Sequence, residues 1–303
     1  MELTGRFVLL ILAVTPTCAL HAQDKDLIVR MTTPIEVHFK GSVPNYGSAF
    51  YFQKLEPVRD PSKAEPQWRA IQALYLVTAK HVIEPSRIGE LSSVDFYLRR
   101  PGSSGVDWLP VTLSRDEVRK RLHVSPKPEV DIAVLDVLDV VTDKMMKSVP
   151  AGAKEGAIPI EPYYAVSEEN FPTKSKITVS AGDDIVVIGY PQYFYDRYNK
   201  LPMLKSGILI TPNGMRYNNQ DALLIDMKSY KGLSGSAVIT KPTALVVDDS
   251  GQVFTRKGGK DFVFLGVYAG QRYRHGDEVP DLGVVWYYYN LEEAVNAPSL
   301  SSK

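Results

Sequence analysis

Gly232-Leu233-Ser234-Gly235-Ser236-Ala237 is a serine turn with a glycine on each side, and it follows two largely apolar segments, each with an ionisable side chain at one end. The first of these, Leu76-Val77-Thr78-Ala79-Lys80-His81, ends in a histidine. The second, Asp131-Ile132-Ala133-Val134-Leu135, begins with an aspartate. Glycine-serine turns and apolar strands are common when taken singly. The order of the three segments, and the strands around them, therefore carry the interpretation.

Short apolar runs separated by Gly, Pro, Asn and Asp predict an all-β chain after the N-terminal segment. The first group of candidate strands is 35–39, 48–53, 74–78, 94–98, 109–113 and 132–137. The second group is 177–179, 185–189, 204–210, 222–225, 237–239, 262–268 and 283–287. Between the groups, residues 141–176 predict a connector. No long helical segments alternate with the strands, which disfavours a parallel α/β sheet.

Two smaller elements complete the expected architecture. Asp248-Asp249-Ser250-Gly251 is rich in turn residues and predicts an inserted β-hairpin between 245–247 and 252–255. Residues 291–295 predict one short C-terminal helix.

The composition is that of an ordinary globular protein without a dominant charge. The chain has 303 residues, of which 44% are hydrophobic and 23% are charged. Lys and Arg together number 35, and so do Asp and Glu. Without a global field of either sign, we expect no nucleic-acid partner and no attraction to an anionic membrane.

The N-terminal residues 1–22 resemble a secretory signal peptide. Arg6 precedes an apolar run over 7–14, and a small-residue cleavage site ends at Ala22. We therefore expect a secreted or periplasmic protein, from a bacterium, with no stable membrane insertion after cleavage. An uncleaved anchor and a lipid anchor at Cys18 are the alternatives. Cys18 is the only cysteine, so cleavage would leave no disulfide, cysteine metal site or thiol nucleophile.

His81 is the histidine best placed for acid–base chemistry. Imidazole can accept a proton from a serine hydroxyl and later give it to a leaving amine. A hydrophobic strand ends immediately before His81, and this would hold the ring at the edge of a cleft. An ordinary structural histidine is the alternative. The other histidines are His21, His38, His123 and His275.

Asp131 and Ser234 are the candidates for the other two roles. A carboxylate at the mouth of an apolar strand can accept from an imidazole N–H and stabilise the imidazolium. Asp136 is a competing carboxylate on the same strand. The glycines beside Ser234 permit a tight bend, and the N–H groups of Gly232 and Ser234 could then form an oxyanion hole. Simple turns are the alternative at both places.

Taken together, the three segments resemble the active-site motifs of trypsin-like serine peptidases, in their characteristic order. Gly47-Ser48-Ala49-Phe50 is similar to the strand that precedes the histidine in that family. Residues 182–191 and 282–285 are similar to two strands of the second β-barrel of that family. The resemblance runs from about residue 35 to residue 295, and it is strongest to secreted bacterial Deg-type proteases, although no PDZ-like domain fits after Asn296.

The resemblance implies two six-stranded antiparallel β-barrels of chymotrypsin type with the site in the cleft between them. Residues 23–150 would form the barrel that carries His81 and Asp131, and residues 151–303 would hold the connector and the barrel that carries Ser234. It implies that Ser234 attacks the substrate carbonyl and that His81 acts first as the base and then as the acid. It also implies that Asp131 orients His81 and that Gly232 and Ser234 bind the oxyanion. The protein is thus expected to be a serine endopeptidase whose partner is a protein or peptide substrate.

The resemblance also implies substrate contacts. Ala269, Gly270 and Gln271 would pair with the substrate backbone as an edge strand. Lys228 would lie at the base of the primary specificity pocket, where an inward ammonium would favour acidic side chains and an outward one would not. Cleavage preference and oligomeric state stay open.

Two departures from the family pattern concern the serine turn. Leu233 stands where digestive enzymes have an aspartate that receives a new N-terminus, so activation by that ion pair is not expected. Ser236 replaces the usual second glycine, a small change that we expect the turn to accept.

Two other interpretations remain open. An α/β-hydrolase would use Ser234, Asp261 and His275, but its elbow needs glycine at position 236 and its fold needs strand–helix alternation. A non-catalytic binding module could keep the barrels while the three side chains are misaligned. No HExxH motif or phosphate-binding glycine loop is present, so we expect neither a metal nor a cofactor.

Overall fold

The computed structural model describes residues 27–58, 68–84, 89–101, 106–148, 165–175, 177–192, 194–243, 245–247, 253–255, 262–274 and 277–300. The signal-peptide expectation, Cys18, Asp261 and His275 lie outside these residues.

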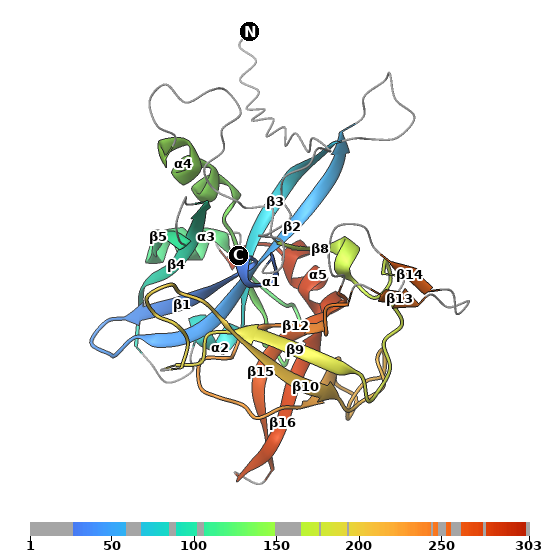
Figure 1. The fold of residues 1–303 in the computed structure, drawn as a ribbon. Helices are drawn as coiled ribbons and strands as arrows, with labels where there is room; N and C mark the ends of the chain where they lie inside the picture. Colours follow the sequence, from blue (N-terminus) through green and yellow to red (C-terminus); the bar gives the residue numbers. More distant parts are fainter. Residues whose placement is uncertain are drawn as a thin grey trace.

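A long antiparallel hairpin of β2 (Asn45–Val58) and β3 (Trp68–Thr78) is the centre of the first sheet (Figure 1). The strand order is β5-β4-β1-β2-β3-β7-β6, and β8 pairs with β2 in parallel. The remaining strands are β1 (Thr32–Phe39), β4 (Leu91–Pro101), β5 (Val106–Ser114), β6 (Leu122–Val124), β7 (Ala133–Asp136) and β8 (Val166–Ser167). Among the described residues, β5 and β6 do not pair with each other, so this sheet is an open half-barrel.

The second sheet is a closed six-stranded barrel in the order β10-β11-β16-β15-β12-β9. Its strands are β9 (Asp184–Gly189), β10 (Met203–Leu209), β11 (Ala222–Asp226), β12 (Ala237–Thr240), β15 (Phe264–Arg274) and β16 (Asp277–Tyr287). All of its neighbouring strands run antiparallel. β13 (Leu245–Val247) and β14 (Val253–Thr255) form a separate hairpin where the turn residues predicted one.

Helices occupy the ends and margins of the sheets. They are α1 (Leu27–Arg30), α2 (Lys80–Ile83), α3 (Arg115–Arg121), α4 (Leu138–Ser148), the 3-10 turn η2 (Glu168–Asn170) and α5 (Tyr288–Asn296). α5 packs against strands of both sheets. No helix among the described residues is both long enough and apolar enough to cross a bilayer.

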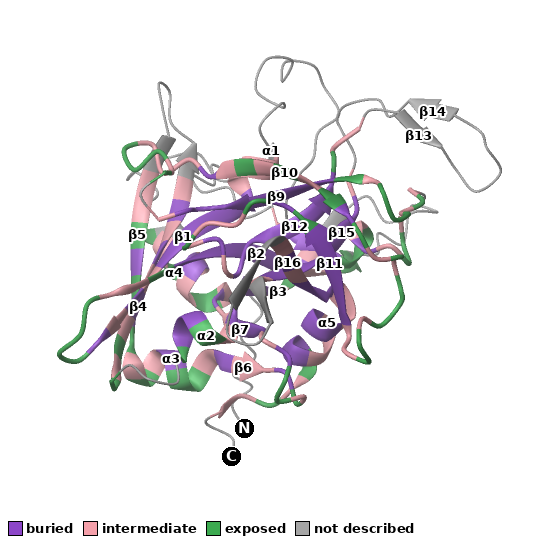
Figure 2. Cartoon of the chain, turned by 90° about the horizontal axis from the view of Figure 1, so that it is seen from below, coloured by how far each residue is buried: buried purple, intermediate pink, exposed green. Residues whose placement is uncertain are grey.

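Buried side chains form one core in each sheet and a third core where the sheets meet. In this third core, Phe50 of β2 packs on Phe264 of β15, with ring centroids 5.3 Å apart. Leu291 of α5 is buried in the same cluster. Figure 2 shows the buried residues concentrated along the central strands, while exposed residues follow the loops and the outer faces of the short helices. The apolar contact between sheets therefore fixes their relative position.

The closed barrel, the open half-barrel of the first sheet and the short C-terminal helix confirm the all-β fold class of chymotrypsin type. The first sheet, however, has eight strands and is open among the described residues, where a six-stranded barrel was expected. Two local expectations were wrong. Residues 177–179 form no strand, and α4 occupies the start of the predicted connector.

Candidate active site

His81 lies in α2, directly after β3 ends at Thr78. Its Nδ1–H donates to Asp131 Oδ2 at 2.5 Å, since a carboxylate can only accept. The backbone N–H of His81 donates to the other oxygen, Oδ1, at 2.9 Å. The His81 side chain is 47% exposed and that of Asp131 is 22% exposed. Asp131 therefore fixes both the ring and its backbone, and Nε2 is left without a hydrogen-bond partner among the described residues.

Asp131 comes from the loop that leads into β7. Asp136, the competing carboxylate, instead accepts from the backbone N–H of Leu138 at the start of α4. The structure thus brings His81 together with Asp131 and not with Asp136. A histidine–aspartate pair is not unique to this place, since His38 Nε2 and Asp95 Oδ2 are 2.9 Å apart on the first sheet.

The Asp131 loop is tied to the barrel by Lys127. Its ammonium donates to Asp221 and to Glu293 of α5, each at 2.8 Å. Burial acts to raise the pKa of Asp221, but the hydrogen bond and charge of Lys127 and the charge of Arg216 outweigh it and hold that pKa below its usual value. The Lys127 ion pair therefore links the loop that carries Asp131 to the second sheet.

The serine turn lies between the sheets, immediately before β12. A Cβ placed on Gly235 would lie 2.3 Å from Thr78 Oγ1 and 2.9 Å from the Ala79 nitrogen, two residues before His81. Both turn glycines have a positive φ, +92° at Gly232 and +88° at Gly235, which only glycine adopts readily. The glycines thus let the turn bend and approach the end of β3.

The backbone amides of the turn divide into two sets. Those of Leu233, Gly235 and Ser236 donate to the carbonyls of Tyr230, Tyr268 and Leu233. Those of Gly232 and Ser234 donate to no acceptor among the described residues.

The directions of the two free amides follow from peptide planarity. In a trans peptide the C=O and N–H bonds point in opposite directions. The Lys231 carbonyl accepts from Gln192 at 2.7 Å, and the Leu233 carbonyl accepts from Ser236 at 3.0 Å. The N–H bonds of Gly232 and Ser234 must therefore point away from these protein partners.

Ser48 of β2 holds the turn from the other sheet. Its Oγ donates to the Gly232 carbonyl at 2.6 Å and accepts from the Tyr190 N–H at 2.7 Å. Its backbone N–H donates to the Ser234 carbonyl at 2.9 Å. Ser48 is fully buried, so water does not compete with these bonds. Sequence reasoning placed Ser48 in a family-like strand but did not assign it this contact.

The Tyr190 side chain is also fully buried. Burial raises the pKa of its hydroxyl to about 12, so the phenol stays neutral at physiological pH. That hydroxyl donates to the Thr32 carbonyl at 3.1 Å. Tyr190 thus ties the end of β9 to β1 by its side chain and to Ser48 by its amide.

No hydrogen bond joins His81 to Ser234 among the described side chains. Bonds of this kind are often long without substrate and shorten in the complex. The close approach of Gly235 to Thr78 and Ala79 brings together the two chain segments that carry Ser234 and His81.

The expected substrate contacts are placed as follows. Gly270 lies beside Ser234, since a Cβ on Gly270 would be 3.9 Å from Ser234 Oγ. Ala269 and Gln271 flank it in β15. Lys228 is exposed, and its ammonium lies over the ring of Tyr230, 5.9 Å from the centroid. Lys228 therefore takes the outward of the two orientations that the sequence left open.

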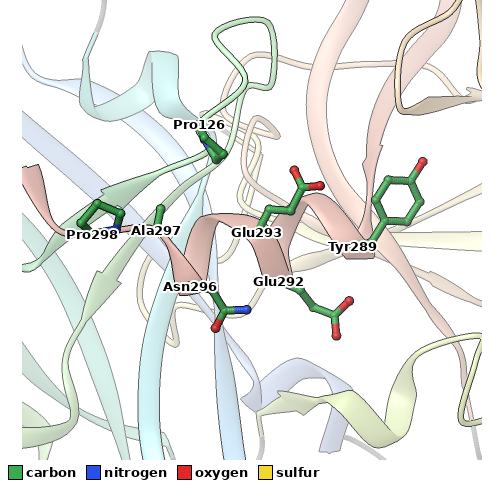
Figure 3. Close-up of a pocket in the computed structure, with 7 residues that line it drawn as sticks. All are labelled: Pro126, Tyr289, Glu292, Glu293, Asn296, Ala297 and Pro298. Carbon is green, nitrogen blue, oxygen red and sulfur yellow. The ribbon is translucent and has the colours of Figure 1, made fainter.

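Two surface depressions lie away from Ser234. One, of about 620 Å³, follows α5 and is lined by Pro126, Tyr289, Glu292, Glu293, Asn296, Ala297 and Pro298 (Figure 3). The other, of about 640 Å³, lies on the first sheet beside α3. Among the described residues, no three His, Cys, Asp or Glu side chains gather as metal ligands would.

Comparison with known proteins gave similarity in structure only. No family model and no curated protein matches the chain. The fold is similar to that of the Rv3671c protease of M. tuberculosis in its active form (TM-score 0.42, 16% identity, 98% of this chain and 93% of that one). It is similar to the serine endoprotease of Yersinia pestis (TM-score 0.41, 14% identity, 88% of this chain and 62% of that one). It is also similar to the MamO protease domain of Magnetospirillum magneticum (TM-score 0.44, 10% identity, 88% of this chain and 96% of that one). All three neighbours are proteases, and the one from Yersinia pestis is a serine endoprotease.

Proposed function

We propose that this protein is a serine endopeptidase in which Ser234 is the nucleophile, His81 the general base and then acid, and Asp131 the residue that orients His81. The observation that carries the proposal is the pair of free amides at Gly232 and Ser234. Backbone N–H groups in a folded turn normally find an acceptor, so two N–H groups without a described acceptor, one of them at the serine itself, are unusual for a turn that only links strands. Donors of this kind stabilise the oxyanion of an acyl-transfer reaction.

The chemistry follows from the proton on His81. With Nδ1–H donated to Asp131, Nε2 is free to take the Ser234 proton as Oγ bonds to the substrate carbonyl carbon. The imidazolium then gives that proton to the amine as the C–N bond breaks. Water next attacks the acyl-enzyme, with His81 again as base, and the Oγ–C bond breaks to release the acid. No cofactor enters these steps.

The substrate is proposed to be an extended peptide that pairs with residues 269–271. β15 pairs with β16 along one side, and on the other side its pairing with β12 ends at Val267. The two backbone bonds between Tyr268 and the serine turn come next. Beyond Tyr268 no described strand covers that side, so a substrate backbone could add there as a strand.

We also propose that the protein acts after export, in the bacterial periplasm or outside the cell. The support is the signal-like sequence of residues 1–22. N-terminal sequencing of the protein from an exporting host would locate the cleavage site.

The test is covalent labelling with a fluorophosphonate probe, in which the Oγ–P bond forms and fluoride leaves. We expect labelling of the wild type and none of Ser234→Ala, whereas the matched control Ser236→Ala, two residues away, should label normally. Labelling that persists in Ser234→Ala would reject this nucleophile. Absence of labelling in the folded wild type would favour a non-catalytic binding module.

The role of His81 is tested separately. His81→Ala should abolish turnover of a peptide substrate, while His38→Ala, which removes the other histidine–aspartate pair, should leave it unchanged. Equal activity of the two variants would contradict the assignment of the base.

A further inference from the structure

Tyr268 is a buried side chain of the barrel whose backbone is hydrogen-bonded to the two residues that follow Ser234. It lies in β15, two residues before Gly270, and its backbone is bound to the serine turn on both sides. Gly235 N–H donates to the Tyr268 carbonyl at 2.8 Å, and Tyr268 N–H donates to the Ser236 carbonyl at 2.9 Å. The α-carbon of Tyr268 is therefore fixed against the nucleophile.

The ring of Tyr268 extends from β15 across β16 to the segment that precedes the serine turn. Its Cε2 is 2.6 Å from the position that a Cβ on Gly283 would take, so the ring covers that glycine. Its hydroxyl donates to Ser229 Oγ at 2.7 Å. The side chain is 0% exposed. The ring is thus held at both ends and fills the space enclosed by these three segments.

An acyl group on Ser234 would lie next to this filled space. Its oxygen would face the amides of Gly232 and Ser234, and its backbone would run along Gly270. A side chain that pointed from that position into the barrel, between the 229–232 segment and β15, would meet the Tyr268 ring, which spans from β15 to Ser229 and covers Gly283. Lys228 is exposed and does not occupy this space.

From this arrangement we infer that Tyr268 is the specificity-determining residue of the site and restricts it to substrates with a small residue, Gly, Ala or Ser, at the carbonyl that Ser234 attacks. The inference rests on the proposed peptidase function. A longer side chain cannot enter unless the ring leaves its hydrogen bond with Ser229 and its contact with Gly283.

The test uses p-nitrophenyl esters of N-acetylated Gly, Ala, Leu and Phe, which acylate Ser234 without recognition of a longer peptide. In each reaction the Oγ–C bond forms and p-nitrophenolate leaves, so the burst of colour measures acylation. We expect the wild type to react at least about 10-fold faster with the Gly and Ala esters than with Leu and Phe, since a pocket misfit of one or more methylenes changes rates about 10- to 200-fold.

Variants at position 268 separate the effect of the ring from that of the hydroxyl. Tyr268→Ala should reverse the order of acylation rates, so that the Leu and Phe esters react faster than the Gly and Ala esters. Tyr268→Phe should keep the wild-type order of rates because the ring remains. If Tyr268→Ala does not fold, Tyr268→Leu opens part of the same space and should raise the rate for Leu relative to Gly.

Each outcome has a distinct meaning. A wild type that prefers Phe or Leu overturns the inference, as does a folded Tyr268→Ala with unchanged order. If the wild type reacts with all four esters no faster than Ser234→Ala does, the proposed function is rejected instead.

Discussion

The hydroxyl of Ser48 should matter more for catalysis than its distance from the substrate suggests. Ser48→Ala keeps the backbone bond to the Ser234 carbonyl but deletes the hydroxyl that joins the Gly232 carbonyl to the Tyr190 N–H. The variant therefore leaves a buried donor and a partly exposed acceptor without partners, and it releases the peptide plane next to the Gly232 amide.

The magnitude follows from these two groups. An unsatisfied buried amide costs about 1–3 kcal/mol and a partly exposed carbonyl costs less, so we expect a loss of about 2–4 kcal/mol of unfolding free energy. Removing one oxyanion donor outright lowers kcat by about 10²–10³. Because Ser48 holds the turn and does not itself donate to the oxyanion, we expect a smaller loss, about 10- to 100-fold in kcat, with little change in KM.

The assay pairs denaturant unfolding with ester hydrolysis and uses Thr33→Val as the matched control. The Thr33 hydroxyl is also buried, donates to the Pro34 carbonyl at 3.0 Å and accepts from the Tyr97 N–H at 3.0 Å, but it does not contact the serine turn. Both variants should lose stability, and only Ser48→Ala should lose kcat. Equal kcat in the two variants at matched folded fraction would refute the reasoning, because Ser48 would then be a structural residue alone.

Three further predictions concern the surroundings of the site. Replacing Lys127 by Met should cost about 1 kcal/mol at neutral pH. Since the pKa of Asp221 is depressed in the folded state, this difference from the wild type should start to shrink as pH falls below the usual aspartate value of 3.8 and should be lost once pH passes below the lower pKa of the folded state. A difference that persists in strong acid would contradict this reasoning. Replacing Ser236 by Ala should raise stability by about 1 kcal/mol, because its Oγ is buried without a partner among the described residues, and a lowered Tm would show that a partner exists. Gly235→Ala should abolish fluorophosphonate labelling, whereas Gly182→Ala, with a similar φ of +93° but no atom within 4 Å of the added Cβ, should cost only the backbone strain of about 1–2 kcal/mol and label normally.

The features that the sequence predicted well are those encoded locally. Alternating and apolar runs predict strands because the period of two is set by the pleat. The glycine-flanked Ser234 and the strand end before His81 are local patterns of the same kind. The pairing of His81 with Asp131 and not with Asp136 was also expected, although it depended on the family resemblance and not on spacing.

The features that the sequence did not predict depend on contacts between distant segments. The hydrogen bond from Ser48 to Gly232 joins residues 184 positions apart. Nothing local to Tyr268 shows that its ring reaches Ser229, since an aromatic residue in a strand usually signals only core packing. One missed element did have a local signal: Ser114 and Glu117 form a capping box, which marks the start of α3.

The serine turn belongs structurally to both sheets. Ser48 of the first sheet binds the carbonyls of Gly232 and Ser234, while Tyr268 of the barrel binds the Gly235 amide. The turn is therefore held by bonds from both sheets, and His81 reaches it only from the first. Loss of the apolar contact between Phe50 and Phe264 would remove the bonds from Ser48 even if the barrel stayed closed. Partial unfolding that separates the sheets should accordingly abolish labelling of Ser234 before the barrel unfolds, because the serine hydroxyl would persist without His81 and without the support of Ser48.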